Sequence, residues 1–225
     1  MHPRFPPKTL SFLRALKRNN KREWFAPRKE QFEQDVRAPM IAVVEQLARD
    51  FRTFAPELEA SPKTSIFRIY RDTRFSEDKS PFKTNIAAAF RWRTLPKGQS
   101  AGLYFEVTHG WVWIGGGYYA PDTPHLVRIR EHISGTYPEI QRLTRKPAFK
   151  KLFGALDGEQ LSRVPRGFAK DDPSADYLRY RSFLAGREFP AAFATRPQFY
   201  PTLVTTFNTA MPLLRFLMQP IDPKR

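Results

Sequence analysis

The stretch RIYRDTRFSEDKSPFKT, residues 68–84, concentrates side chains that could bind or transform an anion. It carries three arginines, two lysines and three acidic residues, and the candidates for a site among them are Arg68, Arg71, Arg74, Asp72, Asp78 and Lys79. A guanidinium is a planar fork that binds phosphate or carboxylate through two hydrogen bonds, and a lysine adds positive charge beside it. We therefore predict an anion site in this segment, with its arginines and its lysine as the ligand-binding residues.

The acidic side chains near these cations allow two interpretations. Asp72 and Asp78 could orient the arginines around a ligand, or one of them could act as a general base. Glu106, midway along a later strand, is a third candidate base and also a candidate counterion for the arginines. Arginine–aspartate pairs also fasten loops to sheets without any catalytic role. The residues alone leave both interpretations open, and they leave open whether the protein is an enzyme.

The order of residue types predicts a β-strand that leads into the charged segment. In SIFRIYRD, Phe67 and Ile69 fall on one face of such a strand. The other face carries Arg68, Tyr70 and Asp72. We expect the apolar face to pack on helices and the arginine face to look outward or into a cleft, with a loop after the strand.

Hydrophobic spacing assigns the rest of the chain. Residues 1–60 read as helical, because apolar residues recur at three-, four- and seven-residue intervals. Residues 61–120 hold short aromatic and β-branched runs separated by turns, which is typical of antiparallel strands. Residues 121–225 read as mainly helical, with RSFLAGREF as a candidate edge strand. We therefore predict an α+β fold, a single domain over 1–225, in which an antiparallel sheet of four to six strands packs against N-terminal and C-terminal helices.

The charge balance widens the range of partners. The 225 residues include 38 Lys and Arg against 22 Asp and Glu, which gives a net charge of +16. Such a surface attracts polyanions and anionic metabolites, so nucleic acid is an alternative partner to an anionic small molecule. The basic residues are scattered along the chain and form no polybasic tail.

Other classes of site and location are disfavoured. The chain has no cysteine, which excludes disulfides, thiolate metal sites and cysteine nucleophiles. Its four histidines lack metal-binding spacing, so we predict neither a metal nor a cofactor. No apolar run approaches the thickness of a bilayer, and the N-terminal residues lack the apolar core of a signal peptide. We expect a cytoplasmic protein without a membrane partner, and the sequence does not predict its oligomeric state.

Three further features invite both a functional and a structural interpretation. The glycines of WIGGGYYAPDTPHL could cradle an anion with their backbone N–H groups, but the closer approach of a neighbouring backbone is the more usual reason for them. In NNKREWF, Trp24 could stack on a base, but such a tryptophan more often packs on the core at a helix start. Pro39 lies inside the apolar pattern of the second helix and should kink or divide it.

The charged segment also resembles the signature of a known family. The matching residues are Arg68, Arg71, Asp72, Arg74, Phe75, Asp78 and Lys79. They resemble the pattern of the bacterial DUF2461 family of uncharacterised proteins. NNKREWF, GLYFEV with GGGYYAP, and VPRGFAKDDPSADYL resemble other recurring segments of that family, so the resemblance spans most of the chain. Phe82 stands where the family pattern has tyrosine, so this chain lacks a phenolic hydroxyl there. The resemblance implies where a site lies and no particular reaction.

Three functions follow from these observations. The first is the binding of a phosphate- or carboxylate-bearing ligand at the charged segment, with hydrolysis or group transfer as the reaction class to test. The second is a nucleic-acid-binding module, which would present a continuous basic face. The third is a non-catalytic structural or interaction protein, in which the charged segment is an ion-pair staple.

Overall fold

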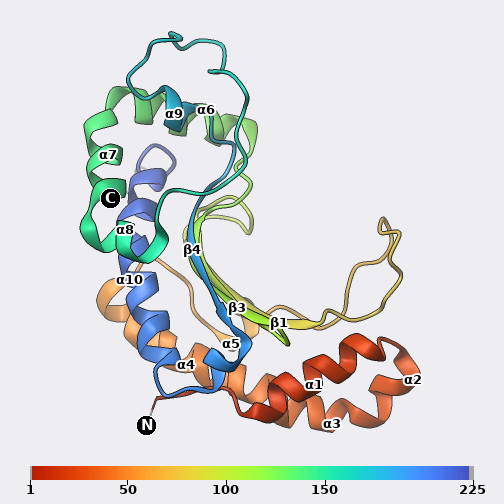
Figure 1. Ribbon diagram of the computed structural model, residues 1–225. Helices are drawn as coiled ribbons and strands as arrows, with labels where there is room; N and C mark the ends of the chain where they lie inside the picture. The colour runs from red at the N-terminus through yellow and green to blue at the C-terminus, as the bar shows by residue number, and fades with distance from the viewer. Residues whose placement is uncertain (1, 223–225) are drawn as a thin grey trace. The chain divides into compact units, whose positions relative to one another are not determined.

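The computed structural model describes residues 2–222, in which helices precede and follow a group of strands (Figure 1). The N-terminal helices are α1 (Pro7–Arg18), α2 (Arg22–Phe25), α3 (Lys29–Phe32), α4 (Ala38–Phe54) and α5 (Pro62–Ser65), with a 3-10 turn at Ala26–Arg28 and a π-helical turn at Glu33–Arg37. The later helices are α6 (Thr123–Gly135), α7 (Tyr137–Arg145), α8 (Pro147–Phe153), α9 (Ala175–Leu178) and α10 (Phe199–Met218), with a 3-10 turn at Ala191–Thr195.

Within the described residues, one antiparallel sheet contains β1 (Asn85–Arg91), β2 (Gly102–Thr108), β3 (Trp111–Tyr118) and β4 (Phe183–Pro190), in the order β1-β2-β3-β4. The α+β class is therefore confirmed. The sheet has four strands, the lower limit of the predicted range. The segment RSFLAGREF contains most of β4, which lies at one edge.

The strand predicted from SIFRIYRD differs from what the structure contains. This segment is extended but pairs only at isolated bridges, Ile66 with Ala88 inside β1 and Tyr70 with Phe82 in the chain before β1. Pro81 interrupts the opposite segment, because proline has no N–H to donate to a ladder. The alternation of apolar and polar residues therefore predicted the extended backbone correctly, but the prediction of a full β-strand was wrong.

The chain divides into two compact units. The first comprises the described residues up to Phe90, Tyr104–Ile114 and Glu188–Thr205, and the second comprises Arg91–Leu103, Gly115–Arg187 and the described residues from Thr206. The polypeptide passes between the units five times. Strands β2 and β3 and helix α10 therefore contribute residues to both.

The core of the first unit forms where helices meet the buried face of the strands. The predicted apolar stripe of the second helical region is buried in full, at Phe25, Phe32, Val36, Met40, Val43, Leu47 and Phe51. Phe51 of α4 packs edge-on against Phe90 of β1, with ring centroids 5.0 Å apart, and Phe105 of β2 contacts Phe199 of α10 at 6.2 Å. Each such ring removes a large apolar surface from water and thereby stabilises the fold.

Pro39, predicted to kink or divide the helical region, lies where a π-helical turn passes directly into α4. The π-helical turn Glu33–Arg37 ends immediately before α4, whose first residues include the proline. Because Pro39 has no N–H, it cannot donate to the carbonyl of Asp35 four residues earlier. The hydroxyl of Thr9, which is fully buried on α1, donates to that carbonyl instead. A side chain from another helix thus satisfies the acceptor that the proline leaves open.

In the second unit, the glycines of β3 permit close packing of backbones. Gly117 has φ 145°, and a Cβ there would lie 1.9 Å from the carbonyl oxygen of Phe183 on β4. A Cβ on Gly116 would lie 2.8 Å from the side chain of Leu103. These contacts leave no room for side chains, so close packing accounts for two of the three glycines, Gly116 and Gly117.

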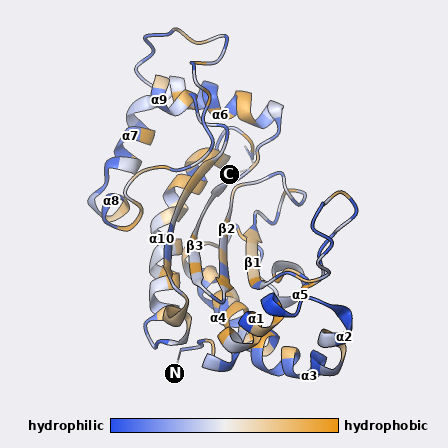
Figure 2. Ribbon diagram, turned by 45° about the vertical axis from the view of Figure 1, so that its right-hand side comes forward, coloured by the Kyte–Doolittle hydropathy of each residue, from blue (hydrophilic) through white to orange (hydrophobic). Residues whose placement is uncertain are grey.

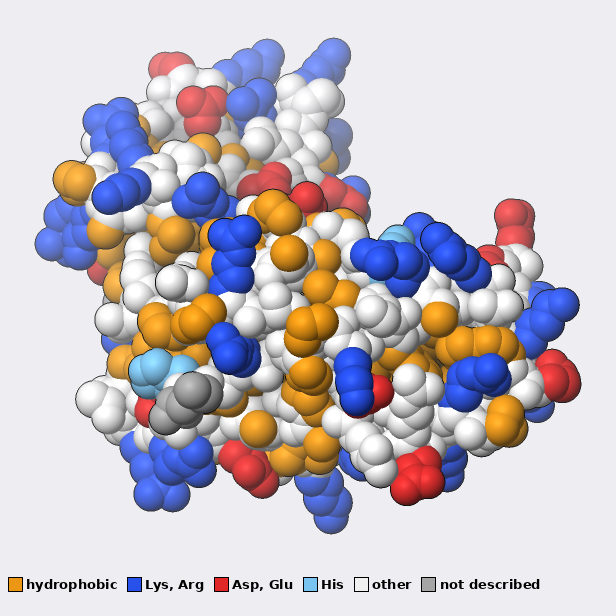
Figure 3. Space-filling model, turned by 60° about the horizontal axis from the view of Figure 1, so that its bottom comes forward, with side chains coloured by type: hydrophobic (Ala, Val, Ile, Leu, Met, Phe, Trp, Pro, Cys, Tyr) orange, Lys and Arg blue, Asp and Glu red, His pale blue; other side chains and the backbone are white. Residues whose placement is uncertain are grey.

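The surface is polar and its charge is dispersed. Figure 2 shows the loop between α5 and β1 as hydrophilic over most of its length. On the face shown in Figure 3, lysine and arginine side chains are interspersed with acidic and apolar ones and form no continuous basic stripe. Among residues 2–222, no helix combines the length and apolar character needed to cross a membrane.

Candidate functional site

The charged motif forms a loop whose cations are held by groups of the same loop. Arg71 pairs with Asp78, and its other nitrogen donates to the Ser76 hydroxyl at 3.3 Å. The Lys79 ammonium donates to the Thr73 carbonyl at 3.0 Å. These contacts link the two limbs of the loop, which extends away from the sheet in Figure 1.

A second ion pair lies within one limb of this loop. Arg74 donates two hydrogen bonds to the Asp72 carboxylate, from Nε to Oδ1 at 3.0 Å and from Nη2 to Oδ2 at 2.8 Å. This is the bidentate geometry in which a guanidinium matches a carboxylate best. The pair is exposed, so solvent weakens its contribution to stability. Arg74 is therefore occupied by a carboxylate of its own loop.

Both aspartates are held in the ionised form. The hydrogen bonds from Arg74 lower the pKa of Asp72, and the nearby charge of Arg68 lowers it further. Hydrogen bonds from Ser80, together with the Arg71 guanidinium, lower the pKa of Asp78 far below its usual range. A carboxylate with a lowered pKa is a weak base at neutral pH. This geometry suits acceptors that fix the loop better than it suits proton-accepting catalysts.

Arg68 differs from the other arginines of the motif. It is exposed, and among the described residues its side chain makes no hydrogen bond or ion pair. Its positive charge acts on Asp72, whose pKa it helps to lower. Its guanidinium therefore retains its hydrogen-bonding capacity for a ligand.

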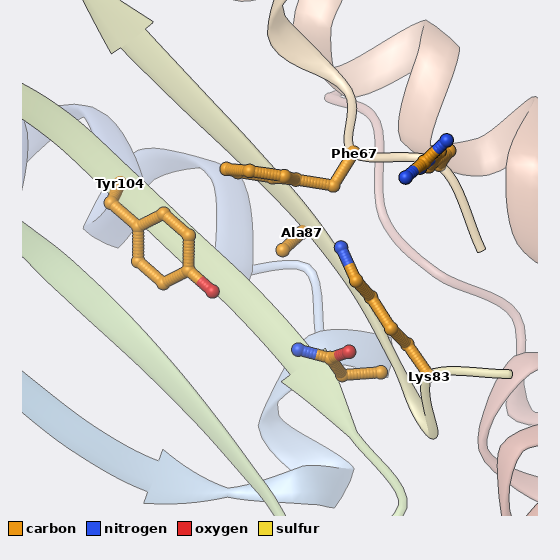
Figure 4. Close-up of a pocket in the computed structure, with 6 residues that line it drawn as sticks. Phe67, Lys83, Ala87 and Tyr104 are labelled. Carbon is orange, nitrogen blue, oxygen red and sulfur yellow. The ribbon is translucent and has the colours of Figure 1, made fainter. Parts of the chain in front are cut away.

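Arg68 lines a pocket of about 200 Å³ beside the sheet. The other lining residues are Phe67, Lys83, Asn85, Ala87 and Tyr104. Figure 4 shows the Tyr104 hydroxyl and the Lys83 ammonium both directed toward the pocket, with the Phe67 ring across it.

Local pairing explains how separate segments build this pocket. The N–H of Lys83 donates to the Ile69 carbonyl at 2.8 Å, and the N–H of Phe67 donates to the Ala87 carbonyl at 3.0 Å. These bonds set the segment before the loop alongside the segment after it. As a result, the side chains of Phe67 and Lys83 meet near the start of β1, and Arg68 lines the same pocket.

Aromatic rings form one wall of the pocket. The Phe67 and Tyr104 rings meet edge to face with centroids 6.1 Å apart, and Tyr104 contacts Trp113 of β3 at 5.9 Å. The Lys83 ammonium lies 4.9 Å from the Phe67 centroid, within the range of a cation–π contact. A flat group bound here would meet both apolar ring surface and positive charge.

Glu106 lies beside this wall and not against the arginines. Asn85 donates its side-chain N–H to Glu106, and no ion pair joins Glu106 to an arginine within residues 2–222. Burial, followed by the nearby Glu106 carboxylate, raises the pKa of Tyr104. A hydrogen bond between the Tyr104 phenol and the Glu106 side chain raises this pKa further, so the phenol stays protonated well above neutral pH and its one O–H donor is already in use.

The sequence thus predicted part of this constellation and missed the rest. It identified Arg68 and Glu106, but Lys83, Asn85 and Tyr104 were not among its candidates. The missed signal lay in the two-residue period of β2, where Leu103 and Phe105 are buried and Tyr104 and Glu106 share the other face. The remaining motif cations lie in the loop and do not line this pocket.

Other candidate features have structural explanations. Trp24 packs on Phe12 at 5.7 Å, with the Arg28 guanidinium 4.6 Å above its ring. The Tyr118 hydroxyl contacts His125 Nδ1 at 2.7 Å, which satisfies two partly buried polar groups. In the part of the chain that the structure describes, no three histidine, aspartate or glutamate side chains gather into a metal-binding cluster.

The comparisons with known proteins settle the family. A family profile described as "Conserved hypothetical protein (DUF2461)" matches residues 8–216. The chain belongs to the DUF2461 family. No curated protein and no solved structure matches it. The loop and the pocket both fall inside the DUF2461 match, so both belong to the part of the chain that the family shares.

The DUF2461 motif departs from its pattern at Phe82, and the structure shows what this ring does. Phe82 is 2% exposed and stacks on Phe25 at 4.2 Å. The Asn20 side chain donates to the Phe82 carbonyl at 2.9 Å and accepts from its N–H at 3.1 Å. The ring therefore anchors the base of the loop to the N-terminal helices, and this role needs no hydroxyl.

Proposed function

We propose that the protein binds a small anionic ligand in the pocket beside β1 and β2. The observation that carries the proposal is Arg68, a guanidinium without an ion pair among the described residues, at a pocket where the Lys83 ammonium and the Tyr104 hydroxyl converge. A carboxylate or phosphate group would accept hydrogen bonds from the Arg68 guanidinium and the Lys83 ammonium, beside the Tyr104 phenol that is already bonded to Glu106.

The shape of the pocket limits the ligand. Its volume of about 200 Å³ is below the roughly 300–1,000 Å³ of sites for drug-sized ligands, so it suits a compact molecule or one end of a larger one. Phe67 and Tyr104 offer ring surface, which favours a flat or ring-bearing molecule. Compact aromatic acids and phosphate esters combine these features.

The proposal is tested by calorimetric titration with benzoate, phenyl phosphate and inorganic phosphate, with benzyl alcohol as the neutral control. Arg68→Gln should weaken binding of the two aromatic anions about 10- to 150-fold, because a charge-assisted hydrogen bond is lost. Arg74→Gln removes the same charge six residues away, but from a residue already paired with Asp72. It should change the affinity less than about twofold.

Two outcomes would contradict the proposal. One is that none of the three anions binds better than benzyl alcohol. The other is that Arg74→Gln weakens binding as much as Arg68→Gln does, since the effect would then come from net charge and not from the pocket.

If turnover accompanies binding, hydrolysis or group transfer at the bound anion is the reaction class to measure first. Glu106 is a carboxylate that contacts two lining residues of the pocket, Asn85 and Tyr104. Glu106→Gln should then abolish turnover of phenyl phosphate, whereas Asp72→Asn and Asp78→Asn should retain it.

A structural role is the second function that a specific observation favours, and it concerns the loop. Arg71, Arg74 and Lys79 each bind a partner within residues 71–79. We propose that these residues hold the loop while Arg68 serves the pocket. Arg71→Ala should accordingly lower the melting temperature without changing the affinity for benzoate or phenyl phosphate.

A further inference from the structure

A second hollow, of about 390 Å³, lies between the NNKREWF segment and the base of the charged loop. One wall includes Lys21–Glu23, and the other includes Tyr70, Arg71 and Lys79. We call this hollow the basic groove. Its two walls are fastened together by the Asn20 side chain, which bonds to the backbone of Phe82 in both directions.

The basic groove carries an excess of positive charge. Lys21 and Arg22 are exposed, and within residues 2–222 neither side chain makes an ion pair or hydrogen bond. Lys79 bonds only to a neutral carbonyl and so keeps its full charge. Glu23 is the one acidic residue in the lining. Leaving aside Arg71, which is paired with Asp78, the lining of the groove thus has three cations and one carboxylate.

Two aromatic rings of the charged segment are exposed to solvent, Tyr70 in the lining of the basic groove and Phe75 outside that lining. Tyr70 lines the groove and is 50% exposed, while Phe82 supports its ring at a centroid distance of 5.4 Å. Phe75, on the loop, is 95% exposed. The Tyr70 ring, held by Phe82 and open to solvent, is a platform on which a nucleobase can stack, and the Phe75 ring offers a second, more exposed stacking surface.

The loop that carries Phe75 is already ordered by its own contacts. Arg71 with Asp78, Arg74 with Asp72, and Lys79 with Thr73 link its parts before any partner arrives. The Arg74 guanidinium also lies 5.6 Å from the Phe75 centroid. Binding therefore needs to order less of the chain, which favours affinity.

These features together select one kind of partner. Cations beside exposed rings match phosphates beside bases. An acidic peptide would use the cations but leave the rings without a matching group, and a duplex hides its base faces in the stack. We propose that the basic groove binds single-stranded nucleic acid, with Lys21, Arg22 and Lys79 at the phosphates and with bases stacked on Tyr70 and Phe75.

This proposal is independent of the small-anion pocket. Fluorescence anisotropy with a labelled oligothymidine of about 12 residues, over roughly 20 to 300 mM NaCl, measures both affinity and its salt dependence. Phe75→Ala removes a ring that is almost wholly exposed and should weaken binding about 5- to 160-fold at a fixed salt concentration.

A charge-matched pair of variants separates the groove from the general positive charge. Lys21→Gln with Arg22→Gln removes two groove cations. Lys150→Gln with Lys151→Gln removes two exposed cations of α8. The groove variant should lower the slope of log K against log salt by about 1.4, since each phosphate contact contributes about 0.7 for single strands. The α8 variant should leave the slope close to that of the unmodified protein.

Four results would overturn the proposal. They are equal effects of the two double variants, no effect of Phe75→Ala, equal affinity for the duplex of the same length, and equal affinity for a polyglutamate of similar charge. Arg68→Gln should leave oligothymidine binding unchanged. The small-anion pocket and the basic groove therefore succeed or fail separately.

Discussion

At the scale of single residues, the arginines of the charged motif differ in whether they bind an acidic side chain. Arg71 and Arg74 are bound to Asp78 and Asp72, whereas Arg68 has neither an ion pair nor a hydrogen bond within the described residues. Identical side chains only a few residues apart thus differ in their bonding partners. An arginine that already holds a carboxylate has lost much of its capacity for a ligand, because its best-aligned donors are in use.

The aspartates of the loop give a prediction about acid. The pKa of Asp78 is lowered from its ordinary value of 3.8, so the folded state favours the ionised form. Its stabilising contribution is complete above the unfolded-state pKa and is lost as pH falls through the lower folded-state value. At neutral pH, Asp78→Asn should therefore have a lower melting temperature than the unmodified protein. As the pH falls below 3.8, the melting temperature of Asp78→Asn should decrease less than that of the unmodified protein.

Circular dichroism melts across this pH range check the prediction. Asp171→Asn is the control, because Asp171 is exposed and has no hydrogen bond or ion pair among residues 2–222. It should keep the pH profile of the unmodified protein. If Asp78→Asn and Asp171→Asn gave the same profile, the Arg71–Asp78 pair would contribute nothing to the stability of the loop.

At the scale of elements, the junction of α1 with α4 depends on one buried hydroxyl. Thr9→Val keeps the shape of the side chain but removes the donor to the Asp35 carbonyl, which Pro39 cannot replace. We expect it to lower the free energy of unfolding by about 1–3 kcal/mol, the penalty for an unpartnered buried acceptor. Urea denaturation measures this change.

Thr9→Ser is the matched variant for this junction. It keeps the hydroxyl and loses one buried methyl group, which costs about 1 kcal/mol. The order of the two variants is therefore diagnostic. A serine variant less stable than the valine variant would mean that packing of the methyl group, and not the hydrogen bond, holds the two helices together.

The sequence predicted elements best where residue spacing alone decides them. The helical stripe that ends at Phe51 is buried throughout, and β1, β2 and β3 lie within the segments NIAAAFRWR, GLYFEVTHG and WVWIGGGYY. The predicted strand around Ile69 failed because strand pairing depends on the partner segment, and Pro81 there lacks a donor. Alternation within one segment carries no information about what lies opposite it.

The site was harder to predict for the same reason. The pocket needs Lys83 to lie beside Phe67, and this follows from hydrogen bonds that cross the base of the loop. The sequence identified the charged side chains but not which of them would neutralise one another. Glu106, expected to face the arginines, bonds to Asn85, because register between β1 and β2 sets its neighbours.

At the scale of the whole molecule, the net charge of +16 opposes folding through repulsion among like charges. Raising NaCl from about 10 to 200 mM screens this repulsion and should raise the melting temperature, by about 2–4 °C for each kcal/mol regained. Scanning calorimetry checks this, and a melting temperature unaffected by salt would contradict it.

Phosphate at matched ionic strength extends the same measurement. A melting temperature higher in phosphate than in chloride would report binding and not screening, because a ligand that binds only the folded state stabilises that state. Arg68→Gln should remove that additional rise and leave the chloride effect intact. The two contributions of positive charge, general and local, are thereby measured on one protein.

Helix α10 has a consequence for the synthesis of the protein. Its first residues, including Phe199 and Leu203, complete the core of one unit, and its later residues, including Phe207 and Leu214, complete the core of the other. Neither core can be finished while this helix is still inside the ribosome. Both units therefore depend on the same late part of the nascent chain, and both would be exposed to chaperones in an incompletely folded state at the same time.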